Sequence, residues 1–178
     1  TTLWLSGNDF GDTGISDLVN SLRHNNGVRH LILGVNKIGM HGTEALASLL
    51  KDNENKLEVI CLGGNDVGDS GACALGKVLP STTLKELFLK NCNISDSGAS
   101  ILSMSLSKNT CLQQVWLGEN KLTDHGAKSF AAALECNSAV RILDLSNNEV
   151  GDAGARALLE MLKLNHTIRT INLEGNKI

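Results

Sequence analysis

The chain has 178 residues, with 16 lysines and arginines against 19 aspartates and glutamates, for a formal charge of −3 with neutral histidines. Its 42% hydrophobic content supports a folded core, and its mild acidity argues against a nucleic-acid binder, which normally presents a basic face. The longest apolar run, residues 130–134, is far shorter than the ~20 residues of a membrane-spanning helix, so no membrane span is expected.

A short motif recurs along the whole chain. It opens as Leu3-x-Leu5-x-x-Asn8 and returns as Leu31-x-Leu33-x-x-Asn36. The anchor position is asparagine in every copy but one, where it is cysteine, and it falls at residues 8, 36, 65, 92, 120, 148 and 176. A period of about 20–29 residues with this pattern is typical of a leucine-rich repeat.

Each copy predicts a strand, a turn, a helix and a return loop. Alternate strand residues share a face, so the leucines point inward and the residue between them points outward. The anchor asparagines suit turns, and stacked copies are expected to form an amide ladder that satisfies buried main-chain groups. Candidate N-caps (Gly, Ser or Thr) stand at residues 11, 39, 68, 95, 123 and 151, each followed by Asp except at Met40. A first-turn glycine at residues 14, 42, 71, 98, 126 and 154 predicts close approach to a neighbouring coil.

A single strand cannot bury its leucines, so the copies are expected to stack. Strands pair at ~4.8 Å whereas helices pack at ~8–10 Å, and the stack must therefore bend. We predict an α/β fold, a right-handed curved leucine-rich repeat solenoid with a parallel sheet on the concave face and helices on the convex face. Residues 1–178 are predicted to form a single domain of about six 28-residue repeats plus a partial repeat, a fragment of a longer array.

The long helical second half of each repeat, as in GDAGARALL at residues 151–159, is joined to Leu-x-Leu-x-x-Asn. This combination resembles the ribonuclease-inhibitor-like class of leucine-rich repeats across essentially the whole chain. The class includes ribonuclease inhibitors, the sensing domains of NOD-like immune receptors and Ran GTPase-activating proteins. The nearly uniform repeats are similar in style to those of the NOD-like receptors. That resemblance implies a sensing or autoinhibitory segment of a larger cytoplasmic protein of innate immunity.

The cysteines are odd in number and contain no Cys-x-x-Cys pair, which favours free thiols in a reducing compartment over a disulfide framework or a zinc site. They are Cys61, Cys73, Cys92, Cys111 and Cys136. Cys73 and Cys136 are expected to pack on helices, and Cys111 is expected in a loop. Glycosylation sequons at Asn93 and Asn165 leave a secreted form open.

Segments that look catalytic are better explained by the repeat. Residues 71–78 nearly match a phosphate-binding P-loop, but Val78 replaces its Ser or Thr and the stretch falls in a repeat helix. Residues 68–71 read Gly-Asp-Ser-Gly like a protease nucleophile segment, yet similar tetrapeptides fill the same position in other repeats. The histidines show no metal-ligand spacing. We expect no active site, no metal and no cofactor.

The residues that separate the two strand leucines form one outward-facing column. They are Trp4, Ile32, Cys61, Phe88, Trp116, Asp144 and Asn172. Both tryptophans and one of the three phenylalanines fall there, on a face that no helix is expected to cover, which predicts an exposed apolar stripe. The preference of large residues for strands is the alternative explanation. Balanced flanking charges suit a protein surface better than a polyanion.

These features together predict a non-catalytic scaffold that binds a protein partner on its concave sheet. The predicted partner-binding residues are Trp4, Ile32, Phe88, Trp116, Asp144 and Asn172. Two alternatives stay open. The resemblance allows a GTPase-activating protein of the Ran type, and the uncapped ends allow end-to-end self-association.

Overall fold

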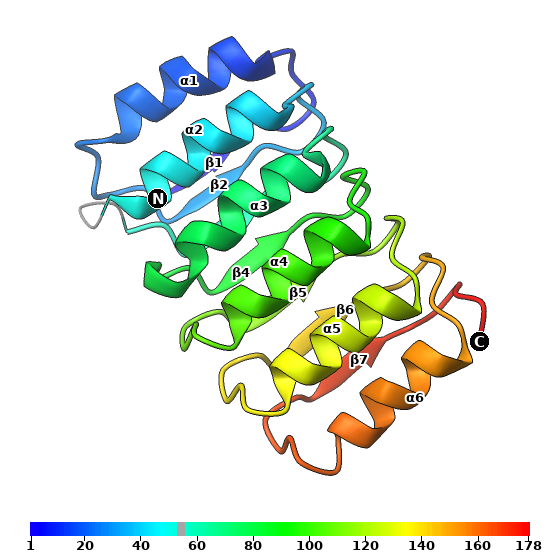
Figure 1. The fold of residues 1–178 in the computed structure, drawn as a ribbon. Helices are drawn as coiled ribbons and strands as arrows, with labels where there is room; N and C mark the ends of the chain where they lie inside the picture. Colours follow the sequence, from blue (N-terminus) through cyan, green and yellow to red (C-terminus); the bar gives the residue numbers. More distant parts are fainter. Residues whose placement is uncertain (53–55) are drawn as a thin grey trace.

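The computed structural model describes residues 1–52 and 56–178, and within them strands and helices alternate along the chain (Figure 1). The strands are β1 (Thr2–Trp4), β2 (His30–Ile32), β3 (Val59–Cys61), β4 (Glu86–Phe88), β5 (Gln114–Trp116), β6 (Ile142–Asp144) and β7 (Thr170–Asn172). The helices are α1 (Gly11–Leu22), α2 (Met40–Lys51), α3 (Gly68–Val78), α4 (Asp96–Leu106), α5 (Asp124–Leu134) and α6 (Asp152–Met161). A short 3₁₀ turn, η1 (Leu79–Ser81), follows α3.

The strands form one parallel sheet whose spatial order is the chain order, β1 to β7. Each strand pairs with the next in direct register, so that Trp4 lies opposite Ile32 and Phe88 lies opposite Trp116. The helices lie side by side on one face of the sheet (Figure 1), and each packs against the next along the chain. The predicted fold is confirmed: the chain forms an open, curved solenoid with the sheet on its concave face and the helices on its convex face.

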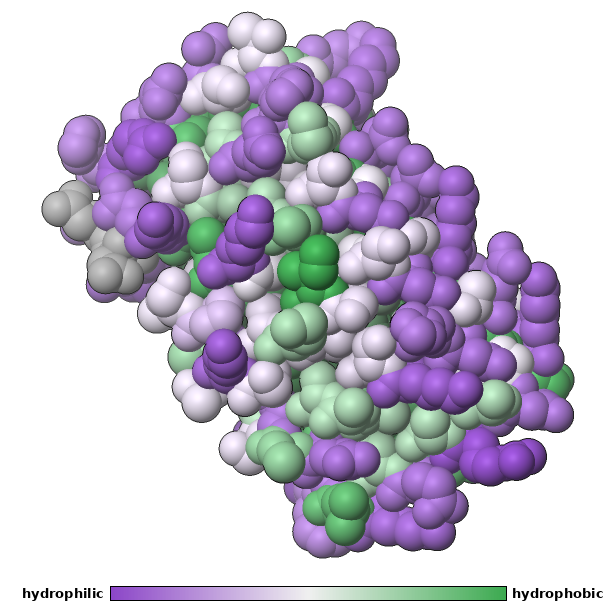
Figure 2. All heavy atoms as spheres, viewed as in Figure 1, coloured by the Kyte–Doolittle hydropathy of each residue, from purple (hydrophilic) through white to green (hydrophobic). Residues whose placement is uncertain are grey.

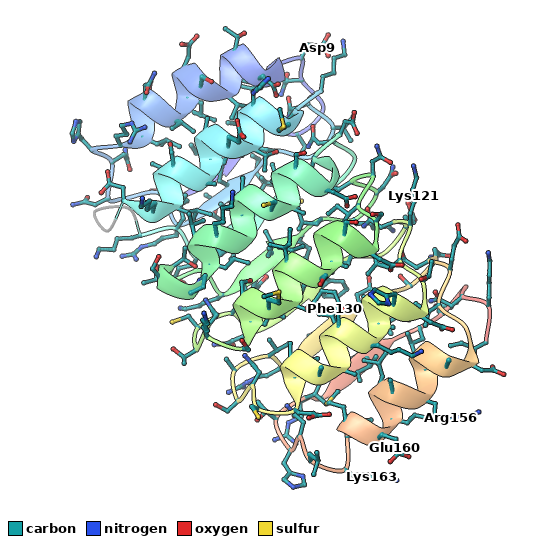
Figure 3. All side chains as sticks on the ribbon, viewed as in Figure 1. Asp9, Lys121, Phe130, Arg156, Glu160 and Lys163 are labelled. Atoms are coloured by element: carbon teal, nitrogen blue, oxygen red, sulfur yellow. The ribbon has the colours of Figure 1, made fainter. Side chains whose placement is uncertain are left out.

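The core lies between the sheet and the helices. Leu31 and Leu33 of the second repeat are 0% exposed, and the equivalent leucines of the other inner repeats are buried in the same way. Each such side chain contributes ~1.5–3 kcal/mol when it leaves water. Phe130 of α5 is fully buried in this core, whereas Arg156, Glu160 and Lys163 lie at the outer surface of α6 and the turn that follows it (Figure 3).

The anchor asparagines form the predicted amide ladder. The Asn65 amide Nδ2 donates to the carbonyl oxygens of Leu62 and Leu33, at 2.8 and 2.9 Å. Its Oδ1 accepts from the backbone N–H groups of Asn36 and Ile38, at 2.8 and 3.0 Å. One side chain therefore completes the hydrogen bonding of two repeats.

A second asparagine ladder, which we did not predict, runs through the return loops. The Asn137 Nδ2 donates to the carbonyl oxygens of Leu106 and Asn109, and its Oδ1 accepts from the backbone of Ala139 and Val140. Asn109 and Asn165 occupy the same position in neighbouring repeats. Asn165 is buried and its amide is fully engaged, so the sequon at this residue is closed in the folded chain, whereas Asn93 is exposed.

The first-turn aspartates cap the next helix of the stack. The Asp96 Oδ1 on α4 accepts from the backbone N–H groups of Thr123 and Gly126 at the start of α5, at 2.8 and 2.9 Å. A Cβ on Gly126 would lie 2.6 Å from that oxygen, so the close approach predicted for the first-turn glycine is confirmed here. Asp69 holds α4 in the same way. Burial alone would raise the pKa of Asp69, but hydrogen bonds from Ser95 and Gly98 outweigh it and lower the pKa.

Two helices begin differently, because no aspartate caps them from a preceding repeat. Helix α1 belongs to the first repeat of the given sequence, and Met40 occupies the aspartate position that would serve α3. The predicted N-caps Gly11 and Gly68 are wrong: each is the first residue of its helix, with a positive φ of 58° and 60°. The predicted N-caps at residues 39, 95, 123 and 151 are confirmed.

Removing one inter-repeat cap tests this account. We expect Asp96→Ala to lower the free energy of unfolding by about 1–3 kcal/mol, because two partly buried N–H groups and the Thr123 hydroxyl lose their acceptor. The measurement is urea unfolding followed by circular dichroism. Asp152→Ala is the matched control, since Asp152 stands at the same helical position with no following helix in this chain, and it should cost only a few tenths of a kcal/mol. Equal losses in the two variants would contradict the capping role.

Candidate functional site on the concave sheet

The strand alternation builds two aligned columns on the concave face. In β4, Leu87 is 1% exposed and points into the core, while Glu86 and Phe88 on either side of it are partly exposed. The predicted column is the one formed by the third residue of each strand. The first residues form a second column of Thr2, His30, Val59, Glu86, Gln114, Ile142 and Thr170.

An aromatic pair lies at the centre of the predicted column. The rings of Phe88 and Trp116 stack with centroids 5.5 Å apart and planes 12° from parallel, and we call this pair the aromatic shelf. The stacking leaves both residues partly buried. Ile32 and Cys61 are also partly buried, whereas Trp4 is 77% exposed. The apolar stripe is therefore present, with Trp4 protruding and the shelf presenting a flat surface.

Residues of the second column hold the shelf in place. The indole Nε1 of Trp116 donates to the Gln114 Oε1 at 3.3 Å, and the Gln114 Nε2 donates to the Glu86 Oε1 at 3.2 Å. Val59 and Ile142 add partly exposed apolar surface to the same column. These residues were not predicted from the sequence, although the two-residue strand period that identified the first column also points to them.

The polar end of the column differs from the expectation. Asp144 is only 5% exposed, because its Oδ1 accepts from the backbone N–H of Ser146 at 3.0 Å. A Cβ on Gly118 of the neighbouring repeat would lie 3.1 Å from the Asp144 Oδ2, so the carboxylate packs against that backbone. The expectation that Asp144 is an exposed partner contact is therefore wrong, and its carboxylate braces the end of its strand. Asn172 makes the same turn with Glu174 but stays partly exposed.

Charged side chains line the edge of the concave face at which the strands begin. Glu58 lies between Lys85 and Arg29, with N···O distances of 2.7 and 3.5 Å, and the hydrogen bond from Lys85 lowers the pKa of Glu58. Along the described part of the chain, Arg141 and Arg169 have no carboxylate within 4.0 Å. The edge next to β6 and β7 therefore presents two uncompensated cations.

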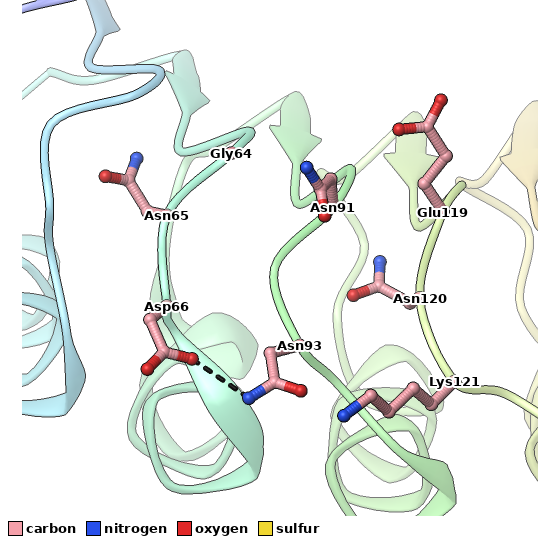
Figure 4. A pocket seen from close by; sticks show the side chains of 8 residues that line it. All are labelled: Gly64, Asn65, Asp66, Asn91, Asn93, Glu119, Asn120 and Lys121. Carbon is pink, nitrogen blue, oxygen red and sulfur yellow. Dashed lines mark hydrogen bonds between the residues drawn. The ribbon is translucent and has the colours of Figure 1, made fainter.

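A polar hollow of about 470 Å³ lies on the loops that follow β3, β4 and β5 (Figure 4). The Asn93 Nδ2 donates to the Asp66 Oδ1 across it at 3.0 Å. Asn65 and Asn120 also line the hollow, but their amide groups already donate to backbone carbonyl oxygens in the asparagine ladder. Nowhere in residues 1–52 and 56–178 do three His, Cys, Asp or Glu side chains gather as a metal site would require.

All five cysteines lie among the described residues as free thiols. Cys92 replaces the anchor asparagine, and its Sγ donates to the Leu62 carbonyl oxygen at 3.3 Å. Burial raises the pKa of Cys92 to about 12. Cys136 is exposed in the turn after α5, so its predicted helix packing is wrong, because α5 ends at Leu134. Cys111 lies in a return loop, as predicted.

The Leucine Rich repeat family profile matches residues 1–19, 54–76, 81–103, 108–131 and 136–159, more than half of the chain. Over 111 residues the chain is 32% identical to NACHT, LRR and PYD domains-containing protein 12 of Mus musculus, covering 62% of this chain and 10% of that protein. Over 91 residues it is 34% identical to ribonuclease inhibitor of Sus scrofa, covering 51% of this chain and 20% of that protein. The chain thus spans about a tenth to a fifth of these relatives, which confirm the resemblance to the ribonuclease-inhibitor-like class.

Two solved structures share the fold. Leiomodin-1 Actin-Binding Site 2 superposes with a TM-score of 0.68 at 20% identity, over 71% of this chain and 76% of that one. Pollen Receptor Kinase 3 superposes with a TM-score of 0.52 at 19% identity, over 89% of this chain and 66% of that one. Among residues 1–52 and 56–178, no helix combines the length and apolar character that crossing a membrane requires.

The two tryptophans should differ in their access to solvent. In Trp116→Phe the emission comes from Trp4 alone, and we expect iodide to quench it strongly, since Trp4 is 77% exposed. In Trp4→Phe the emission comes from Trp116, whose ring is stacked on Phe88, and quenching should be several-fold weaker. Stern–Volmer plots measure both. Equal quenching of the two variants would contradict the stacked shelf.

The cysteines of the folded chain should differ in how fast they react with a thiol reagent. At about pH 8 a thiol with a pKa of about 12 is almost entirely protonated, so Cys92 should react with a chromogenic disulfide reagent only after unfolding. Exposed Cys136 should react within the fast phase. The variant Cys136→Ser should lose amplitude from that phase, while Cys92→Ser should leave it unchanged. Fast labelling of Cys92 in the folded chain would be inconsistent with its burial.

Proposed function

This chain belongs to the leucine-rich repeat family, and we propose that it is a non-catalytic recognition scaffold whose concave sheet binds a protein partner. The observation that carries the proposal is the aromatic shelf of Phe88 and Trp116, which lies on the sheet face that the helices leave uncovered. Large aromatic side chains commonly dominate the energetics of protein interfaces.

The form of the shelf supports binding. The stack with Phe88 and the hydrogen bond to Gln114 hold the Trp116 indole in one orientation before any partner arrives. A surface that is already ordered loses little conformational entropy on association. Trp4 and Ile32 extend the apolar column toward β1, and Asn172 adds a partly exposed polar group at its β7 end.

The edge charges favour a defined orientation of the partner. Arg141 and Arg169 lie beside β6 and β7 without a paired carboxylate in the described chain. A partner that places apolar side chains on the shelf and carboxylates near these arginines would match both features.

The relatives support the same class of function. Ribonuclease inhibitor is named for its action on an enzyme, and the NACHT, LRR and PYD proteins carry the repeats as one domain among several. By analogy, we propose that this chain serves as a sensing or autoinhibitory segment of a protein of the latter kind. The free thiols fit a cytoplasmic location.

Substitutions on the shelf test the proposal. We expect Phe88→Asp and Trp116→Asp each to lower the affinity for a concave-face partner by at least about tenfold, because a carboxylate replaces an aromatic anchor. Proteins captured from lysate by the wild-type chain are identified by quantitative mass spectrometry, and the affinity for each is measured with purified components.

The control variant is Asn20→Asp, which adds the same charge at an exposed position of α1. It should retain the partners that both shelf variants lose, with all variants showing the wild-type circular dichroism spectrum. If the shelf variants retain full affinity for every captured protein, the concave sheet is not the binding site.

A further inference from the structure

The convex face departs from the repeat pattern on α4. The first-turn position, which is Asp96 in α4 and Met40 in α2, is equivalent in all six of the described helices. Eight residues further on, the helices carry Asn20, Ser48, Lys77, Met104, Ala132 and Glu160. Five residues further on, they carry Asp17, Ala45, Ala74, Ile101, Ser129 and Ala157. At both positions α4 carries a large apolar side chain where the other helices carry a small or polar one.

The fold does not require Met104 to be apolar, whereas Ile101 also packs against α3 at Gly76. Met104 is 68% exposed and Ile101 is partly exposed, so neither completes the core beneath α4. Figure 2, which looks onto the helical face, shows a strongly hydrophobic spot near the middle of that face among residues of intermediate hydropathy, with hydrophilic residues farther out. A contiguous apolar patch with a polar rim commonly marks an interaction site.

The two residues lie in a hollow between α3 and α4. It measures about 480 Å³ and is lined on the α3 side by Cys73, Gly76 and Pro80, with Ile101 and Met104 on the α4 side. A Cβ on Gly76 would lie 2.9 Å from the Ile101 Cγ2 and 3.2 Å from the Ile101 carbonyl oxygen. The glycine therefore lets α4 approach closely and seats the isoleucine side chain. We call this hollow the α3–α4 groove.

The charged side chains that line the groove are all positive. Lys77 and Lys108 line it, and none of its lining residues is acidic. Within the part of the chain that the structure describes, neither lysine has a carboxylate within 4.0 Å. The groove thus combines an apolar floor with two uncompensated ammonium groups.

We propose that the α3–α4 groove is a docking site for an acidic amphipathic peptide segment of a protein partner. An apolar side chain of that segment rests on Ile101 and Met104, and its carboxylates meet Lys77 and Lys108. The thioether of Met104 is flexible and polarisable and can adapt to different apolar side chains. A hollow with two cations fits a peptide better than an anionic bilayer, which is flat and is recognised by larger basic clusters.

This site is separate from the concave sheet. The groove lies among the helices, and the aromatic shelf lies on the opposite face of the sheet. The two sites can be occupied together, and the proposal for the groove does not rest on the function proposed for the sheet.

A peptide-display selection tests the proposal. A random-peptide library is selected on the wild-type chain and counter-selected on Met104→Asp, which is expected to fold because Met104 is exposed. We expect the surviving peptides to be enriched in Asp and Glu next to large apolar residues. A fluorescein-labelled synthetic copy of the most enriched peptide is then measured by fluorescence anisotropy. Its affinity should fall about tenfold in Met104→Asp and in Lys77→Glu or Lys108→Glu, and should weaken with added salt.

Two controls separate this site from other surfaces. Ala132→Asp adds a carboxylate at the aligned, exposed position of α5, and Trp116→Asp removes the aromatic shelf; both should bind the peptide like the wild type. The proposal is overturned if counter-selection leaves no peptides, if the survivors are basic, or if Trp116→Asp rather than Met104→Asp abolishes binding. It is also overturned if vesicles of anionic lipid bind the groove in preference to acidic peptides. The function proposed for the concave sheet is tested separately, by the affinity of Phe88→Asp and Trp116→Asp for the proteins captured from lysate.

Discussion

Each repeat depends on the next one for the hydrogen bonds of its own loops. Several carbonyl and N–H groups between a strand and its helix are paired by a side chain of a neighbouring repeat, as the contacts of Asn65 and Asp96 show. A buried polar group left without a partner costs about 1–3 kcal/mol, so several such groups per repeat would offset much of its leucine burial. The stack, and not the single repeat, is therefore the unit that is stable.

The places where this scheme is interrupted show how local its effects are. Met40 and Cys92 remove both side-chain acceptors that would serve the loop before α3, and there the Gly68 N–H donates to the Cys92 carbonyl oxygen at 2.9 Å instead. The loop before α1 takes the same form, with the Gly11 N–H bonded to the Asn36 carbonyl oxygen at 2.9 Å. In that arrangement the buried Asn36 Oδ1 has no partner among the described residues. A helix of this stack can therefore begin without an aspartate cap, through a backbone hydrogen bond to the next repeat. Glycine permits this arrangement because it adopts a positive φ readily.

The fold could be predicted from the sequence because the fixed repeat period determines which residues of neighbouring strands lie opposite each other. Once residues 36 and 65 are known to be equivalent, the parallel pairing, the inward leucines and the asparagine ladder follow. The sequence was insufficient for the contacts of the first-turn aspartates: Asp96 has the same spacing to its own helix start as an ordinary N-terminal charge, and only stacking brings it to Thr123. The burial of Asp144 was not predicted for a related reason. The alternation of strand residues gives the face on which a side chain lies, but it does not show that the Asp144 carboxylate folds back to accept a hydrogen bond from the Ser146 N–H. The ladder through Asn137 has a signal in the sequence, because asparagine recurs at residues 109, 137 and 165. These residues lie outside the Leu-x-Leu-x-x-Asn motif and were therefore not predicted to form a ladder.

In a repeat protein, equivalent positions of successive repeats can be compared with one another to find residues that stacking does not explain. Positions that face a neighbouring repeat are constrained by stacking, and their residues vary little along the chain. Positions that face solvent are free of that constraint, so a large apolar residue there has no structural cause within the stack. Trp4 on the sheet and Met104 on the helices meet this condition, since each is more than half exposed. The surrounding chemistry differs: the sheet presents rings fixed by Gln114, whereas the helices present a flexible thioether between two lysines. A rigid surface favours one shape and an adaptable one accepts several, so the two faces of this solenoid are suited to partners of different selectivity.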